Sequence, residues 1–126
     1  MKTDIVTIWV NQQTGEERTE RRMADLCKGD YAIVRIKDTF SVYHVPSGLA
    51  VRVFSTMPTI KERKAQAKQL MELMYLAPKM GKVETKIETT ATGRTWTATP
   101  DPEWAEYARK AIGTVQPEFR NIFGSL

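Results

Sequence analysis

Three short strand-like runs followed by one capped, amphipathic helix constrain the fold of this chain more than any other feature. The runs are Tyr31–Lys37, Phe40–Val45 and Leu49–Phe54, and the helix is expected from Ile60 to about Ala77. Alternation with a period of two, as in Leu49–Phe54, is the signature of a strand. Apolar residues fall on both faces of the runs, so we expect a sheet covered on one side and partly on the other.

The start of the helix carries the clearest local signal. Thr59 is a candidate N-cap and Glu62 stands three residues later, which is the capping-box pattern. Apolar residues recur at helical spacing, namely Ile60, Ala67, Leu70, Met71, Met74 and Ala77. We expect this face to pack on the sheet with Leu70 and Met74 buried, and Pro78 and Gly81 to end the helix.

The N-terminal segment predicts a hairpin. Ile5–Val10 is an apolar, β-branched run, and the polar segment Asn11–Gly15 that follows is typical of a turn. The charged segment Glu16–Arg22 fits either a second strand or the start of a short helix. We favour a hairpin followed by a turn of helix over Met23–Cys27.

After the long helix, a threonine-rich hairpin and a second helix are expected. Val83–Thr90 and Arg94–Thr99 alternate in the manner of strands, and one face is almost entirely polar. Asp101 with Pro102 then predicts a helix start, and Gly113 its end. The buried residues of that helix should be Trp104, Ala108, Ala111 and Ile112. The tail Gln116–Leu126 should add one helical turn.

Together these segments predict a single domain, residues 1–126, of the α+β class. An antiparallel sheet of three central strands plus hairpins should pack against the long helix, with a C-terminal helix beside it. No apolar run approaches the ~20 residues of a membrane span, and the N-terminus lacks the apolar core of a signal peptide. A single cysteine, Cys27, excludes an internal disulfide. We therefore expect a protein of a reducing cytoplasm without membrane association.

No stretch carries an enzyme signature. One His and one Cys cannot supply the ligands of a usual zinc site, and no glycine-rich phosphate loop is present. A nucleophilic Cys27–His44 pair would lack any flanking motif. We expect Cys27 to be a buried spacer and His44 a structural hydrogen-bonding residue at the turn. The sequence therefore predicts a non-enzymatic protein with no catalytic residues, cofactor or metal.

Basic residues are the remaining signal, with a net charge of +4 and a pI of about 9.3. One cluster is Arg18, Arg21 and Arg22, whose role the sequence leaves open. The other is formed by Lys61, Arg63, Lys64 and Lys68 on the long helix. Such groups suit phosphates or an acidic protein surface, although an exposed helix face is often only solvated. Basic residues near a helix N-terminus oppose its dipole, which hints at a partner.

The threonine-rich hairpin offers a second candidate surface around Arg94 and Trp96. Trp96 is either an exposed binding anchor or covers the open face of the sheet together with Ile87. The candidate partner-binding residues are therefore Lys61, Arg63, Lys64, Lys68, Arg94 and Trp96.

The segment Phe40–Gly48 (FSVYHVPSG), followed by a strand and by Lys61–Lys68 (KERKAQAK), resembles a hairpin–helix unit of small bacteriophage and mobile-element proteins. Some of those proteins inhibit host defence or host enzymes, as anti-CRISPR proteins do. The resemblance implies compact, non-catalytic binding to, and inhibition of, a host protein or nucleoprotein complex in the bacterial cytoplasm. It assigns no individual site residues.

The order of three strands and a basic helix also resembles the double-stranded RNA-binding domain, in which the start of the last helix contacts phosphates. Lys61, Arg63 and Lys64 match that basic start. The chain departs from the pattern in its first helix, reduced to Met23–Cys27, and in the loop Ser55–Pro58, which has no glycine. This second resemblance implies the alternative function of a basic nucleic-acid-binding module.

Overall fold

The computed structural model of the chain describes residues 4–10, 18–55, 58–91 and 93–115, and these have the predicted α+β fold. In chain order the described elements are β1 (Ile5–Val10), β2 (Arg18–Met23), β3 (Leu26–Lys28), β4 (Tyr31–Ile36), β5 (Thr39–His44), β6 (Leu49–Phe54), α1 (Ile60–Tyr75), β7 (Glu84–Thr90), β8 (Gly93–Thr99) and α2 (Pro102–Val115).

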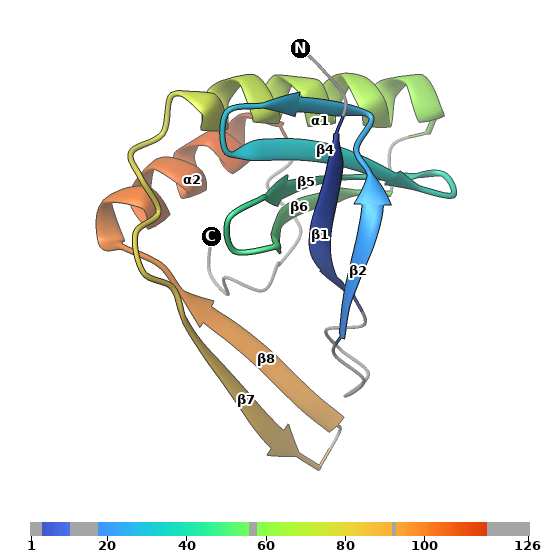
Figure 1. The fold of residues 1–126 in the computed structure, drawn as a ribbon. Helices are drawn as coiled ribbons and strands as arrows, with labels where there is room; N and C mark the ends of the chain where they lie inside the picture. Colours follow the sequence, from blue (N-terminus) through green and yellow to red (C-terminus); the bar gives the residue numbers. More distant parts are fainter. Residues whose placement is uncertain (1–3, 11–17, 56–57, 92, 116–126) are drawn as a thin grey trace.

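An antiparallel sheet with strand order β3-β4-β5-β6 forms the centre of the molecule. The helices lie against one face and the β1–β2 hairpin lies against the other, whereas the β7–β8 hairpin extends away from the body (Figure 1). Coverage of one face and part of the other was expected from the sequence, because both faces of the strands carry apolar side chains.

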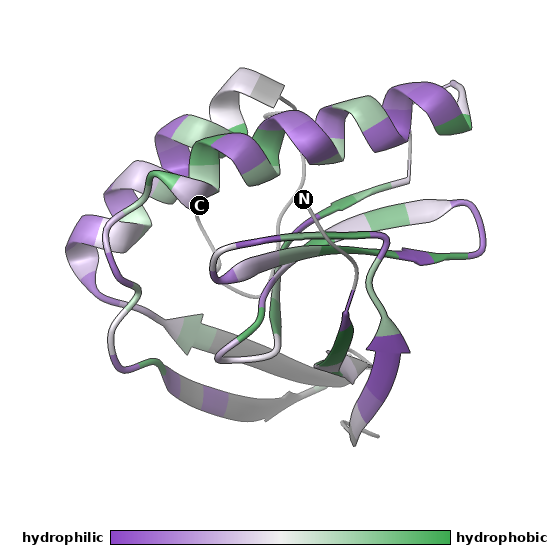
Figure 2. Ribbon diagram, turned by 45° about the horizontal axis from the view of Figure 1, so that its top comes forward, coloured by the Kyte–Doolittle hydropathy of each residue, from purple (hydrophilic) through white to green (hydrophobic). Residues whose placement is uncertain are grey.

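Each face of the sheet has its own apolar cluster. On the helix side, the strands contribute Tyr31, Ile33, Phe40, Val42, Leu49, Val51 and Phe54. On the hairpin side, the cluster is Val6, Ile8, Ala24, Ala32, Val34, Tyr43 and Ala50. Figure 2 shows hydrophobic residues in the central strands and hydrophilic ones along the outer side of α1. The outer side of α1 is thus left to solvent or to a partner.

Helix α1 begins as predicted, because Thr59 Oγ1 accepts a hydrogen bond from the Glu62 N–H at 3.1 Å. Its fully buried residues are Ala67, Leu70, Met71 and Met74, which confirms the prediction for Leu70 and Met74. Ile60 is 39% exposed and does not join the core, contrary to the predicted apolar face. The helix ends at Tyr75, where the Leu76 N–H bonds back to carbonyls of the last turn.

The predicted alternation of β6 is interrupted by a β-bulge, because its pairing with β5 shifts between Val42 and Tyr43. As a result Phe54 joins the helix-side cluster and Val53 is 42% exposed, the reverse of strict alternation. Arg52, opposite Val42, is buried, and burial lowers the pKa of its guanidinium.

The segment Met23–Cys27 is not the helical turn that the sequence predicted. β2 runs to Met23, and β3 (Leu26–Lys28) pairs with β4 through a turn in which Lys28 faces Tyr31. Gly29 in that turn has φ +58°, which glycine adopts without steric cost. A hydrogen-bonded ladder with β4 satisfies the backbone groups that one isolated helical turn would leave exposed.

The C-terminal elements largely follow the prediction. β7 pairs with β8 as a hairpin, and Trp104, Ala108, Ala111 and Ile112 of α2 are buried. α2 continues past Gly113, its predicted end, to Val115. The predicted turn Asn11–Gly15 and the last helical turn in Gln116–Leu126 lie outside the described residues.

Candidate binding surface

The most distinctive charged feature is a row of three lysines on α1, Lys61, Lys64 and Lys68, which we call the lysine stripe. Spacings of three, four and seven residues place them on one face of the helix. All three are exposed, whereas the buried residues of α1 lie on an adjacent face of the helix. The helix thereby projects three ammonium groups away from the core.

None of the stripe lysines has a carboxylate partner among the described residues. Glu72 stands four residues after Lys68 and could pair with it by helical spacing. Instead, Glu72 pairs with Lys28 of β3. The carboxylate best placed to neutralise the stripe is therefore engaged across the helix–sheet boundary.

Arg63, predicted to act with these lysines, has a different environment. It lies one residue before Lys64, so it is turned about 100° from it around the helix. The Arg63 side chain is half-buried, and its Nη1 donates a hydrogen bond to the backbone carbonyl of Asp38 at 2.8 Å. Part of its role is therefore structural, since it joins α1 to the β4–β5 turn.

Tyr75 shares the face of the stripe, seven residues beyond Lys68, and sequence reasoning missed it. Tyr75 is 50% exposed, and the Lys28 ammonium lies 4.7 Å from the centroid of its ring. A Cβ at Gly29 would lie 2.8 Å from Tyr75 Cδ1, so the ring packs directly on the Gly29 backbone. The i+7 spacing was the one signal in the sequence, but this packing depends on the turn before β4.

The two other predicted site residues, Arg94 and Trp96, lie on β8, opposite Thr89 and Ile87. Their side chains are outside the described part of the structure, so the predicted exposure of Trp96 stays a prediction. The hairpin and α1 are at opposite ends of the molecule (Figures 1 and 2). The structure therefore does not bring Arg94 and Trp96 together with the lysine stripe.

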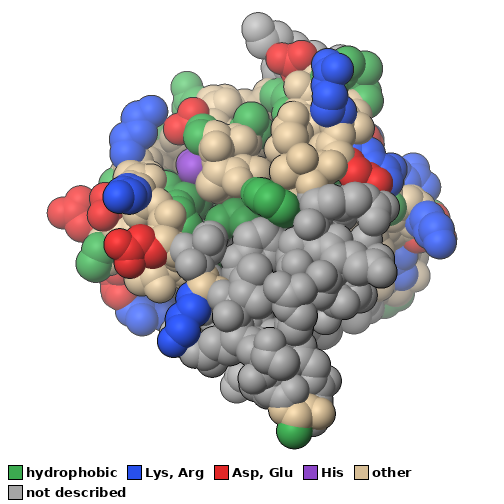
Figure 3. All heavy atoms as spheres, turned by 60° about the horizontal axis from the view of Figure 1, so that its bottom comes forward, with side chains coloured by type: hydrophobic (Ala, Val, Ile, Leu, Met, Phe, Trp, Pro, Cys, Tyr) green, Lys and Arg blue, Asp and Glu red, His purple; other side chains and the backbone are tan. Residues whose placement is uncertain are grey.

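The face that includes the β7–β8 end of the molecule shows no concentration of positive charge in its described part (Figure 3). Hydrophobic side chains gather at its centre, and Lys, Arg, Asp and Glu are mixed toward its margin. On β2, Arg22 pairs with Glu20 at 3.0 Å and Arg21 is exposed, while the Arg18 side chain lies outside the description. The predicted arginine cluster is thus partly neutralised.

His44 is a structural hydrogen-bonding residue, as predicted. Its Nδ1 lies 2.8 Å from Ser47 Oγ and accepts the Ser47 N–H at 3.3 Å, which shapes the β5–β6 turn. Burial lowers its pKa, against a smaller upward effect of Asp30. Cys27 is opposite Ala32 and half-buried, whereas His44 is opposite Tyr31 on the other face of the sheet. The two therefore do not form a nucleophilic pair.

Three further observations bear on function. Among the described residues, no three His, Cys, Asp or Glu side chains come together as a metal-binding group. No helix in the described ranges is long and apolar enough to cross a bilayer. Comparisons of the chain with protein-family models, with curated proteins and with solved structures found no match.

Proposed function

We propose that this chain is a non-enzymatic protein that binds a phosphate-bearing host macromolecule, a nucleic acid or a nucleoprotein complex, through the lysine stripe. Binding would take place in the bacterial cytoplasm and inhibit the host macromolecule, as the resemblance to small bacteriophage proteins implies. The observation that carries the proposal is the uncompensated charge of Lys61, Lys64 and Lys68.

The pairing pattern supports a role for this charge. Several basic side chains elsewhere in the described structure lie within 4 Å of a carboxylate, as Lys28, Lys79 and Lys110 do, whereas Lys37 and Lys82 have no such partner among the described residues. The stripe has three such lysines on one helix face, with Glu72 of the same helix engaged by Lys28 and Glu62 not paired with any of them. Because positive charge near a helix N-terminus is slightly unfavourable for folding, a partner is a sufficient reason to keep it there.

Phosphate is a better match than an acidic protein surface. Lysine is a compact, strongly hydrated point charge that attracts phosphates without demanding a fixed geometry. Protein–protein interfaces, by contrast, are depleted of lysine relative to the rest of the surface. A row of three lysines without an apolar residue between them on that face therefore favours a polyanionic backbone.

The test replaces Lys61, Lys64 and Lys68 together by Gln. Binding to a fluorescent oligonucleotide, followed by anisotropy over a range of salt concentrations, should weaken. The negative slope of log K against log[salt] should become shallower by roughly 2 to 3. Stability should hold or rise by about 0.3–1 kcal/mol at most, since Lys61 in the first turn opposes the helix dipole.

A matched control removes three charges elsewhere, with Lys82, Arg109 and Lys110 changed to Gln. Equal binding by the two triple variants would exclude the stripe as the binding surface. If the wild type binds neither single-stranded nor duplex oligonucleotides, but a nuclease-treated lysate still yields a stripe-dependent protein partner, the phosphate assignment is wrong and an acidic protein surface replaces it.

A further inference from the structure

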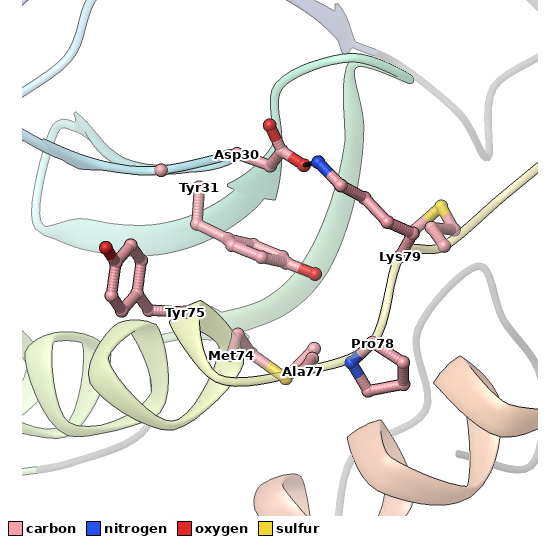
Figure 4. A pocket seen from close by; sticks show the side chains of 9 residues that line it. Asp30, Tyr31, Met74, Tyr75, Ala77, Pro78 and Lys79 are labelled. Atoms are coloured by element: carbon pink, nitrogen blue, oxygen red, sulfur yellow. Dashed lines mark hydrogen bonds and ion pairs between the residues drawn. The ribbon is translucent and has the colours of Figure 1, made fainter.

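A small pocket opens at the C-terminal end of α1, next to the lysine stripe (Figure 4). Side chains from three parts of the chain converge on it: the turn before β4, the last turn of α1 and the segment after it. They include Asp30, Tyr31, Tyr75, Pro78 and Lys79. The volume is about 190 Å³.

The volume limits what the pocket can hold. Sites for drug-sized ligands and cofactors measure about 300–1,000 Å³, so this pocket suits one ring of a larger molecule. Pro78 and the half-exposed ring of Tyr75 supply apolar surface. Because Tyr75 packs against Gly29, its ring is held in place before any ligand arrives.

The polar groups of the pocket carry both signs of charge and include both hydrogen-bond donors and acceptors. Asp30 Oδ2 and Lys79 Nζ form an ion pair at 3.4 Å, with Lys79 88% exposed (Figure 4). The Tyr31 hydroxyl accepts a hydrogen bond from Trp104 Nε1 at 2.7 Å, and among the described residues nothing accepts its own proton. The Asp30 carboxylate disfavours a phosphate inside the pocket, whereas a neutral ring with donors and acceptors matches these groups.

The position of the pocket relative to the stripe indicates which kind of molecule carries this ring. Tyr75 is seven residues from Lys68, which corresponds to about 10 Å along the helix. Cationic side chains that follow a backbone, combined with an aromatic platform for bases, are the usual means of binding a single strand. A duplex would keep its bases stacked and paired, out of reach of a recess of this kind.

We propose that this pocket receives one nucleobase of a single-stranded nucleic acid, stacked on Tyr75, while the phosphates of the same strand lie along the lysine stripe. This inference rests on the proposed function and specifies its substrate class. Asp30 and Lys79 then contact the edge of the base, and the Tyr31 hydroxyl is the buried donor at the bottom of the pocket.

The test compares a deoxythymidine strand of about 12 nucleotides, within the usual site size, with an abasic strand that has the same number of phosphates. Wild-type protein should bind the abasic strand about tenfold more weakly, the size expected for one stacked base. Tyr75→Leu should weaken thymidine binding by about the same factor and leave abasic binding unchanged. Tyr75→Phe is the matched control and should retain the thymidine affinity.

The outcomes separate the inference from the proposal on which it rests. Equal binding of the two strands by wild type, with both dependent on the stripe, overturns the base pocket and leaves phosphate binding in place. Tighter binding of a duplex than of the single strand overturns it as well. Loss of affinity in Tyr75→Phe equal to that in Tyr75→Leu would show that the hydroxyl, not the stacking surface, is used. Binding of neither strand removes the proposed function itself.

Discussion

Arg63 Nη1 donates a hydrogen bond to the backbone carbonyl oxygen of Asp38 at 2.8 Å, across 25 residues of sequence. The bond joins the first turn of α1 to the turn between β4 and β5. The Asp38 carboxylate also forms an ion pair with Arg35 of β4, with 3.6 Å between Oδ1 and Nη2. One arginine of the predicted basic cluster is thereby committed to the fold, whereas Lys64 beside it is exposed.

The Arg63→Gln variant tests this division of roles. Removal of the hydrogen bond should lower the free energy of unfolding by about 0.5–1.5 kcal/mol, measured by urea denaturation. Lys64→Gln removes the same charge from the next residue and should leave stability unchanged or slightly higher. An equal effect of the two substitutions would mean that the Arg63–Asp38 bond contributes nothing to stability.

The β4–β5 turn itself contains a strained residue. Lys37 has φ 56°, and it is the only non-glycine residue with positive φ in the described ranges. An L side chain in this region costs roughly 1–2 kcal/mol, so Lys37→Gly should stabilise the protein by about 0.5–1 kcal/mol after the entropy of glycine is counted. Lys37→Ala keeps the Cβ and should give no gain. If alanine stabilises as much as glycine, the relief comes from charge and not from the backbone.

Local signals explain most of what the sequence predicted correctly. The Thr59 cap, the buried face around Leu70 and the β7–β8 hairpin each depend on residues close together in the chain. The helical turn expected over Met23–Cys27 failed for the opposite reason, because pairing of β3 with β4 decides that segment. The bulge in β6 likewise depends on the register with β5, which no pattern within Leu49–Phe54 reveals.

The candidate site likewise has features that the sequence predicts and features that depend on the tertiary structure. The lysine stripe was predictable because helical spacing alone sets it. The engagement of Glu72 by Lys28, which leaves the stripe uncompensated, joins residues 44 positions apart. The pocket at Tyr75 requires Gly29 and Asp30 to meet the end of α1, so it appears only once the sheet and the helix are packed together.

Packing of α1 on the sheet should account for much of the stability. Leu70 and Met74 are both fully buried in the helix-side cluster. Replacement of either by Ala should cost about 2–5 kcal/mol, since each leaves a cavity that the sheet cannot fill. Gln69→Ala, at an exposed position of the same helix, is the control and should stay within about 0.5 kcal/mol of wild type. Unchanged melting temperatures for both core variants would contradict the position of α1 in the core.

Stability should depend on pH through His44. The side chain is 5% exposed, and burial lowers its pKa below the ordinary value, with Lys79 acting in the same direction and Asp30 in the opposite one. A hydrogen bond also favours the neutral form of His44, because Nδ1 accepts the Ser47 N–H and can do so only when unprotonated.

His44 therefore binds a proton more readily in the unfolded chain than in the folded protein. The stabilisation that unprotonated His44 contributes is complete above its pKa in the unfolded chain, about 6.5. It is lost as pH falls from there toward the lower pKa of His44 in the folded protein. Urea midpoints measured between about pH 7.5 and pH 5 should decrease for the wild type in this range, which lies above the carboxylate pKa values of about 4. His44→Gln removes the titrating group and should flatten this part of the profile, whatever its overall stability. The same slope in both proteins would assign the pH dependence to other groups and leave His44 without a role in it.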